Sequence, residues 1–150
     1  MKTVTGGAKE DLKHVLKKKE ILALQDLVGR VPVADHIFQY VARLVRSTRP
    51  AEGDPPGFVR DWVSWGCGPR ASLNLITGAK ARAILRGRFN VAIEDIKALA
   101  LPVMRHRMGL NFAAQSEGVD TDAVINQLLE TVPTGGDLYD GAESRKVASV

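Results

Sequence analysis

The stretch Gly66-Cys67-Gly68-Pro69-Arg70-Ala71-Ser72-Leu73 decides the fold, because it turns the chain sharply into its longest predicted helix. Pro69 suits the first position of a helix, since its missing N–H would have no intrahelical partner there. We expect this helix to run from Pro69 to about Arg86, with Gly87 ending it. The side chains expected to face a core are spaced along one helical face: Leu73, Ile76, Ala79, Ala83 and Ile84.

Four more segments carry the apolar periodicity of helices, at residues 20–29, 34–48, 93–107 and 123–131. In the second of these, the predicted core face consists of Ile37, Phe38, Val41, Leu44 and Val45. Residues 58–65 are expected to form a packed loop or a short extended segment, and no convincing strand alternation is present. The sequence therefore predicts an all-α fold, a small bundle of four to five helices with flexible termini.

Composition indicates one globular domain between two polar ends. The chain has 150 residues, of which 45% are hydrophobic and 25% charged, enough to bury one core. We expect a flexible basic arm over residues 1–19, a helical domain over 20–133 and a disordered acidic tail over 134–150. The single cysteine excludes an internal disulfide, and no apolar run approaches the ~18 residues of a membrane span. With no apolar signal segment near the start, a cytoplasmic location is expected.

The net charge of +4 is unevenly spread. Residues 34–110 hold 12 basic against 6 acidic side chains, a net +6, whereas residues 111–150 hold 2 against 7, a net −5. A basic body with an acidic end predicts an anionic partner, which is a nucleic acid, a nucleotide or an acidic protein face.

No complete enzyme active site is recognisable. The phosphate-binding pattern G-x-x-x-x-G-K-[ST] does not occur, so the chain lacks the parts that bind and hydrolyse a nucleotide alone. The histidines are scattered and, with one cysteine, have no metal-ligand spacing: His14, His36 and His106. Cys67 has no neighbouring His or Asp pattern and is interpreted as a packed small residue.

Arg70 is the first side chain that the long helix presents after Pro69. Its guanidinium stands near the free N–H groups of the helix start, and the two together favour an anion such as phosphate. Pairing with a carboxylate such as Asp61 is an equally open alternative. The acidic pair Glu94-Asp95 is interpreted as a helix-start signal rather than as a pair of catalytic acids.

Five groups of residues follow one another in a specific order, at 20–25 with 31–33, 40–50, 66–71, 79–91 and 94–107. Together they resemble the C-terminal helical lid of MoxR-type AAA+ ATPases, over about residues 20–133. The turn at 66–71 is similar to the family's Gly-Ala-Ser-Pro-Arg-Ala and departs from it at Cys67 and Gly68. A second departure is Ala92-Ile93, where the family commonly has a hydroxyl residue and a proline.

The resemblance implies that Arg70 is the sensor 2 arginine, which reaches from the lid to the terminal phosphate of the nucleotide. Pro69 and Gly68 would shape the nucleotide-facing turn. The resemblance also implies contacts with an ATPase core and with neighbouring subunits of a hexameric ring, for which Arg49, Arg88 and Arg105 are candidates.

An ATPase core has no counterpart in these 150 residues. ATP and Mg²⁺ would therefore be bound only together with such a core, and no activity is expected of this chain alone. The client protein is unknown. Two alternatives remain beside the lid, namely a small basic helical nucleic-acid binder and a protein-interaction adaptor. The scattered arginines favour neither a recognition helix nor a nucleic-acid partner.

Overall fold

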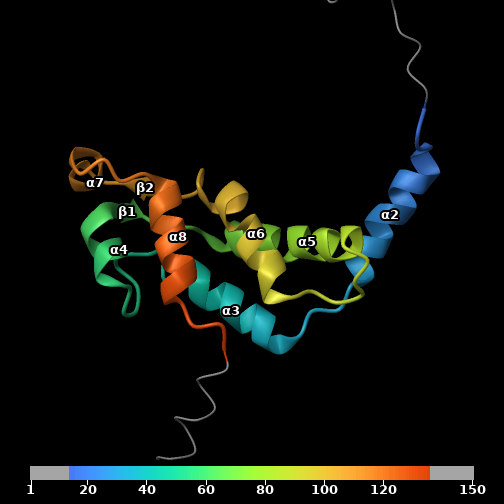
Figure 1. Ribbon diagram of the computed structural model, residues 1–150, viewed down its shortest axis with the longest axis horizontal. Coiled ribbons are helices and arrows are strands. Elements are labelled where there is room, and N and C mark those ends of the chain that lie inside the picture. Colours follow the sequence, from blue (N-terminus) through green and yellow to red (C-terminus); the bar gives the residue numbers. More distant parts are fainter. Residues whose placement is uncertain (1–13, 136–150) are drawn as a thin grey trace, which may run out of the picture.

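The computed structural model describes residues 14–135, which form an elongated helical body (Figure 1). In chain order its elements are α2 (Lys18–Arg30), α3 (Asp35–Arg46), α4 (Gly57–Trp62), β1 (Val63–Trp65), α5 (Pro69–Leu85), α6 (Ile93–Met104), β2 (Gly109–Leu110), α7 (Phe112–Ser116) and α8 (Thr121–Thr131). The predicted all-α class is confirmed, since the longer helices α2, α3, α5, α6 and α8 dominate the fold. The predicted basic arm lies mostly outside the described residues, and the predicted acidic tail lies almost wholly outside them.

The core forms where α5 packs against α6 and α3. One side of α5 is buried at every fourth residue, through Ala71, Leu75, Ala79 and Ala83. These side chains are mostly small, which lets the neighbouring helices approach closely. Gly78 contributes to the same closeness, because a Cβ added there would lie 2.8 Å from Cδ1 of Leu99.

Two predicted core residues are wrong. Leu73 is 66% exposed, and Leu75 is buried in its place; two residues correspond to about 200° around a helix, so they lie on opposite sides. In α3, Phe38 is 48% exposed, whereas Tyr40 is fully buried. The predicted core face did not include Tyr40, whose ring completes the buried side of the helix.

The segment at 58–65 is more structured than predicted. It begins with the short helix α4 and continues into β1, which pairs antiparallel with β2 and places Val63 opposite Leu110. Asn111 caps α7 at this end of the molecule by accepting a hydrogen bond from the Ala114 N–H at 3.0 Å. Figure 1 shows α4, α7 and the two strands grouped at the end of the body opposite α2.

Candidate functional site

The turn before α5 is anchored to the end of α3. The Cys67 N–H donates to Oγ1 of Thr48 at 2.8 Å, and Nε of Arg49 donates to the Cys67 carbonyl at 2.9 Å. Thr48 is fully buried and donates its own hydroxyl to the Val45 carbonyl at 2.6 Å. Gly66 passes so close to Thr48 that an added Cβ would overlap its backbone. The N–H and the carbonyl of Cys67 are therefore both hydrogen-bonded to residues at the end of α3, and these bonds fix the position of the turn.

Arg70 projects from this fixed turn into solvent. Gly68 is the N-cap of α5 and provides no side-chain hydrogen bond, while Pro69 at the first helical position has no N–H. Arg70 is exposed, and it forms no ion pair or hydrogen bond with any residue that the structure describes. The pairing with Asp61 that the sequence left open is therefore not formed within residues 14–135.

The exposed face of α5 continues from Arg70 along the helix. Leu73, Asn74 and Thr77 follow it at offsets of three, four and seven residues, and all three are exposed. A guanidinium is thus followed by an apolar side chain and two neutral polar ones on one solvent-facing strip. Such a strip can bind an anion at its start and contact a protein surface beside it.

The other candidate arginines make contacts within the chain. Arg49 pairs with Glu52 at 2.7 Å in addition to binding the Cys67 carbonyl. Arg105 pairs with Asp122 at 2.8 Å and so joins the end of α6 to α8. Arg88 pairs with Asp95 at 2.5 Å. Much of the positive charge is therefore matched by local carboxylates, which disfavours a continuous surface for nucleic acid.

Asp95 is a buried carboxylate that the sequence interpretation treated only as part of a helix start. Its Oδ2 accepts the Ala92 N–H at 3.0 Å, as that interpretation requires. Its Oδ1 also faces the guanidinium of Arg88 and, at 3.3 Å, Nε of Arg82. Burial by itself would raise the pKa of Asp95, but the hydrogen bonds from Arg88 and Ala92 and the two positive charges outweigh it and lower the pKa. The network ties α5, the loop after it and α6 together.

Cys67 is fully buried, and its thiol lies 3.8 Å from the Met104 carbonyl. Burial raises the pKa of this thiol, and the contact with Thr48 and the nearby arginine charges oppose the shift only in part. The thiolate is the reactive form, so we expect thiol reagents at pH 7 to label folded Cys67 at least ~100-fold more slowly than the urea-unfolded chain. Equal rates in the two states, followed by absorbance of the released thiolate, would show that the turn opens freely.

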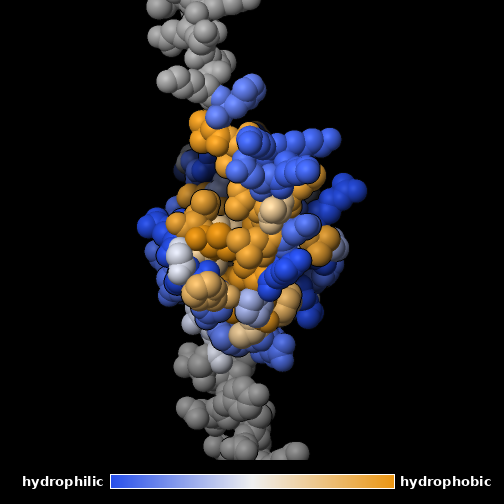
Figure 2. Space-filling view, turned by 90° about the vertical axis from the view of Figure 1, so that its right-hand side faces the viewer, coloured by the Kyte–Doolittle hydropathy of each residue, from blue (hydrophilic) through white to orange (hydrophobic). Residues whose placement is uncertain are grey.

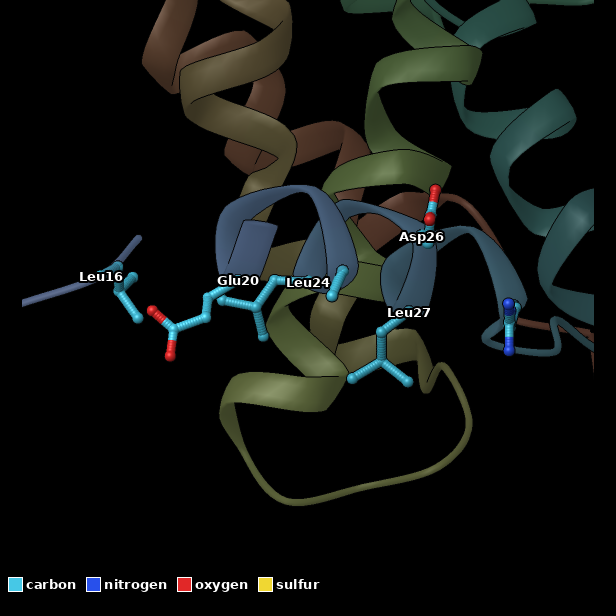
Figure 3. A pocket seen from close by; sticks show the side chains of 7 residues that line it. Leu16, Glu20, Leu24, Asp26 and Leu27 are labelled. Carbon is cyan, nitrogen blue, oxygen red and sulfur yellow. The ribbon is translucent and has the colours of Figure 1, made fainter. Parts of the chain in front are cut away.

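α2 carries apolar side chains that the described residues leave largely uncovered. α2 has no buried residue. Four of its apolar side chains and one just before it are 45–50% exposed: Ile21, Leu22, Leu24, Leu27 and the preceding Leu16. Figure 3 shows Leu24 and Leu27 on one side of α2 and Asp26 pointing the other way, with Leu16 on the segment that leads into the helix. The exposed side chains Leu85 and Phe89 add to the same end of the molecule, where apolar groups gather in Figure 2.

We call this surface the apolar end and define it by Leu16, Leu24, Leu27, Leu85 and Phe89. A pocket of about 410 Å³ opens within it between Leu27 and Phe89. Nζ of Lys80 donates to the Gly29 carbonyl at 3.0 Å and ties α2 to α5. Exposed apolar surface of this kind is typical of an interaction surface.

Among residues 14–135, no group of three or more His, Cys, Asp or Glu side chains lies close enough to hold a metal ion. The three histidines are all exposed. None of the described helices is long and apolar enough to cross a membrane.

Comparison with protein families matches residues 59–128 to the AAA lid domain. The matched residues include the anchored turn, all of α5 and α6, and most of α8.

Two relatives extend the similarity to most of the chain. Chaperone MoxR1 of Mycobacterium tuberculosis is 35% identical over 120 residues, which are 80% of this chain and 32% of the relative. The uncharacterised protein YeaC of Bacillus subtilis is 32% identical over 123 residues, 82% of this chain and 36% of the relative. This chain thus spans about a third of the length of the curated relatives it matches.

A crystal structure of a protein assigned as an ATPase in Cytophaga hutchinsonii has the same architecture. It superposes with a TM-score of 0.79 at 29% identity, over 87% of this chain and 40% of the other. Fold and sequence similarity therefore agree over the same helical body.

Proposed function

This chain carries an AAA lid domain of the MoxR type, and we propose from that premise that it is the lid through which an AAA+ ATPase senses its nucleotide. Arg70 is the proposed sensor 2 residue, and the nucleotide is bound by an ATPase core. The observation that carries the proposal is an exposed arginine without a partner in the described residues, at the start of α5, on a turn that Thr48 and Arg49 hold in place.

The chemistry required of Arg70 is recognition of a phosphate oxygen. A guanidinium forms short, charge-assisted hydrogen bonds with phosphate and is always protonated near neutral pH. The start of α5 adds the positive end of the helix dipole beside it. ATP would supply the terminal phosphate, and Mg²⁺ would be held by the core, since the described residues contain no carboxylate cluster for a metal.

The fixed turn explains how phosphate binding would move the whole lid. Because the peptide of Cys67 is clamped to α3, and α5 packs on α6, a pull on Arg70 displaces these helices together. Loss of the terminal phosphate after hydrolysis would release that pull. The angle of the lid would therefore depend on the state of the nucleotide.

The apolar end is proposed to be the surface on which the ATPase core packs. Leu24 and Leu27 are half exposed on a helix that has no buried residue, and Leu16, just before that helix, is half exposed as well. The relatives are about three times as long as the region they share with this chain. In a protein of that length, the remaining part would cover this surface. Contacts with neighbouring ring subunits are proposed for the strip that begins at Arg70.

The test is a chimera in which residues 14–135 replace the matching segment of a MoxR-type ATPase. The grafted protein should hydrolyse ATP faster than the core without any lid, and Arg70→Ala should lower the rate at least ~10-fold with ATP binding retained. Arg86→Ala is the matched control, because Arg86 is also an exposed arginine and lies at the other end of α5. The isolated chain should not hydrolyse ATP.

Two outcomes would contradict the proposal. One is a graft that restores no hydrolysis beyond that of the lidless core. The other is equal rates for the Arg70→Ala and Arg86→Ala chimeras.

A further inference from the structure

One face of α2 has the residue spacing of a helix that pairs with another helix. Glu20, Ala23, Leu27 and Arg30 follow one another at intervals of three, four and three residues, and all four are exposed. At about 100° per residue they fall within a sector of about 80° on the helix surface. Alternating intervals of three and four residues are those by which helices pack side by side in a coiled coil.

These four residues line a hollow of about 530 Å³ along α2, and Leu16 extends its apolar wall beyond the start of the helix (Figure 3). The side chain of Arg30 forms no ion pair or hydrogen bond within residues 14–135. Glu20 accepts a hydrogen bond from the Lys17 N–H at 2.6 Å and has no ion pair in that range either. The face therefore presents one charge of each sign, with apolar side chains between them.

The order of these residues makes the face complementary to itself. In an antiparallel pair of α2 helices centred on Gln25, Glu20 of each copy lies opposite Arg30 of the other. In the same register the small Ala23 lies opposite Leu27, so a large side chain meets a small one on both sides of the centre. A parallel pair would instead place like charges against each other at both ends of the face.

We propose that the face formed by Glu20, Ala23, Leu27 and Arg30 binds a second copy of this chain, as an antiparallel pair of α2 helices. A two-fold axis at Gln25 relates the copies, so every contact occurs twice and the dimer is closed. The 13 residues of α2 span only about 20 Å, which gives a small interface. We therefore expect a weak dimer, with a dissociation constant of ~10–100 µM.

The second copy occupies part of the apolar end that the ATPase core is proposed to cover, since Leu16 and Leu27 belong to both surfaces. The two occupants exclude each other, so the dimer competes with docking of the lid on the core. Arg70 lies at the start of α5, whereas Lys80 ties α2 to a later part of that helix. The hydrolysis test of Arg70 and the test of the dimer can therefore fail separately.

Sedimentation equilibrium of the full chain from ~5 to ~500 µM, at ~50 mM salt, measures the dimer. Glu20→Arg and Arg30→Glu should each weaken dimerisation at least ~10-fold, because each turns two attractive charge pairs into two repulsive ones. The double variant Glu20→Arg/Arg30→Glu should recover the parent affinity to within ~5-fold, and so should an equimolar mixture of the two single variants. Every chain with Glu20→Arg loses the bond from the Lys17 N–H, so only restored pairing between copies explains such a recovery.

Lys97→Glu and Glu130→Arg are the matched controls. They make the same charge changes at exposed sites that lie outside the hollow and have no ion pair in the described residues. Both should leave the dissociation constant unchanged.

Three results would overturn the proposal. A parent chain that stays monomeric up to ~500 µM would leave the core as the occupant of this face. A dimer that the single reversals weaken and the double variant does not recover would exclude the antiparallel register. A dimer that none of the variants changes would lie elsewhere on the molecule.

Discussion

Replacing Gly66 by alanine is expected to lower the free energy of unfolding by about 3 kcal/mol. A Cβ at this position would overlap the carbonyl and the hydroxyl of Thr48. The obstacle is backbone, which cannot rotate away as the end of a side chain can. The turn must therefore move off α3, and the bond from the Cys67 N–H to Thr48 is lost with it. Urea unfolding followed by circular dichroism measures the change.

Gly68→Ala is the matched control for this prediction. Gly68 lies two residues away in the same turn, has an extended backbone, and has no atom within 4 Å of an added Cβ. Its replacement should change the stability by less than ~1 kcal/mol, because alanine is only a somewhat poorer N-cap than glycine. If the two variants were equally stable, the close approach of the turn to α3 would be refuted.

Replacing Asp95 by alanine is also expected to cost about 3 kcal/mol. The substitution removes the carboxylate that faces Arg82 and Arg88 and the acceptor for the Ala92 N–H. The start of α6 loses its only side-chain acceptor in the described structure, and two arginines are left side by side. Both arginine side chains are about a third exposed, so water compensates part of the loss.

The loss of stability caused by Asp95→Ala is expected to depend on pH. The pKa of Asp95 is lowered in the folded state, so its contribution is complete above the unfolded pKa of ~3.9 and disappears as the pH falls through the lower folded pKa. The difference in stability between the parent and Asp95→Ala should therefore be constant near neutral pH and shrink below about pH 4. Glu94→Ala, an exposed neighbour in the same helical turn, should cost less than ~1 kcal/mol. Equal losses for the two variants would contradict the buried network.

Local patterns in the sequence were sufficient for the five long helices and for the turn that carries Arg70, but not for the short helices α4 and α7. Apolar periodicity located the long helices, and the combination of Gly68 with Pro69 marked where α5 begins. The buried side of α5 could not be predicted from the sequence, because this alanine-rich helix has two nearly equivalent apolar sides. Only packing against α3 and α6 decides that Leu75 is buried and Leu73 is not.

The supports of the candidate site could not be predicted in this way, since they join residues distant in the sequence. Thr48 and Arg49 bind the Cys67 peptide from 19 and 18 residues away. The apolar stripe of α2 was recognised as a helix, but its exposure becomes visible only once the rest of the chain is in place. A single sequence also does not reveal that Thr48 contacts Gly66, so no signal was available for the role of Thr48.

The position of Arg70 relative to bound nucleotide tests the central claim most directly. It can be determined by cryo-electron microscopy of the grafted ATPase with a non-hydrolysable ATP analogue and, separately, with ADP. We predict that the Arg70 guanidinium lies about 3 Å from a terminal phosphate oxygen in the first state and withdraws in the second. An Arg70 side chain that points into solvent, or binds a protein carboxylate, in both states would contradict the proposal that this lid senses the nucleotide.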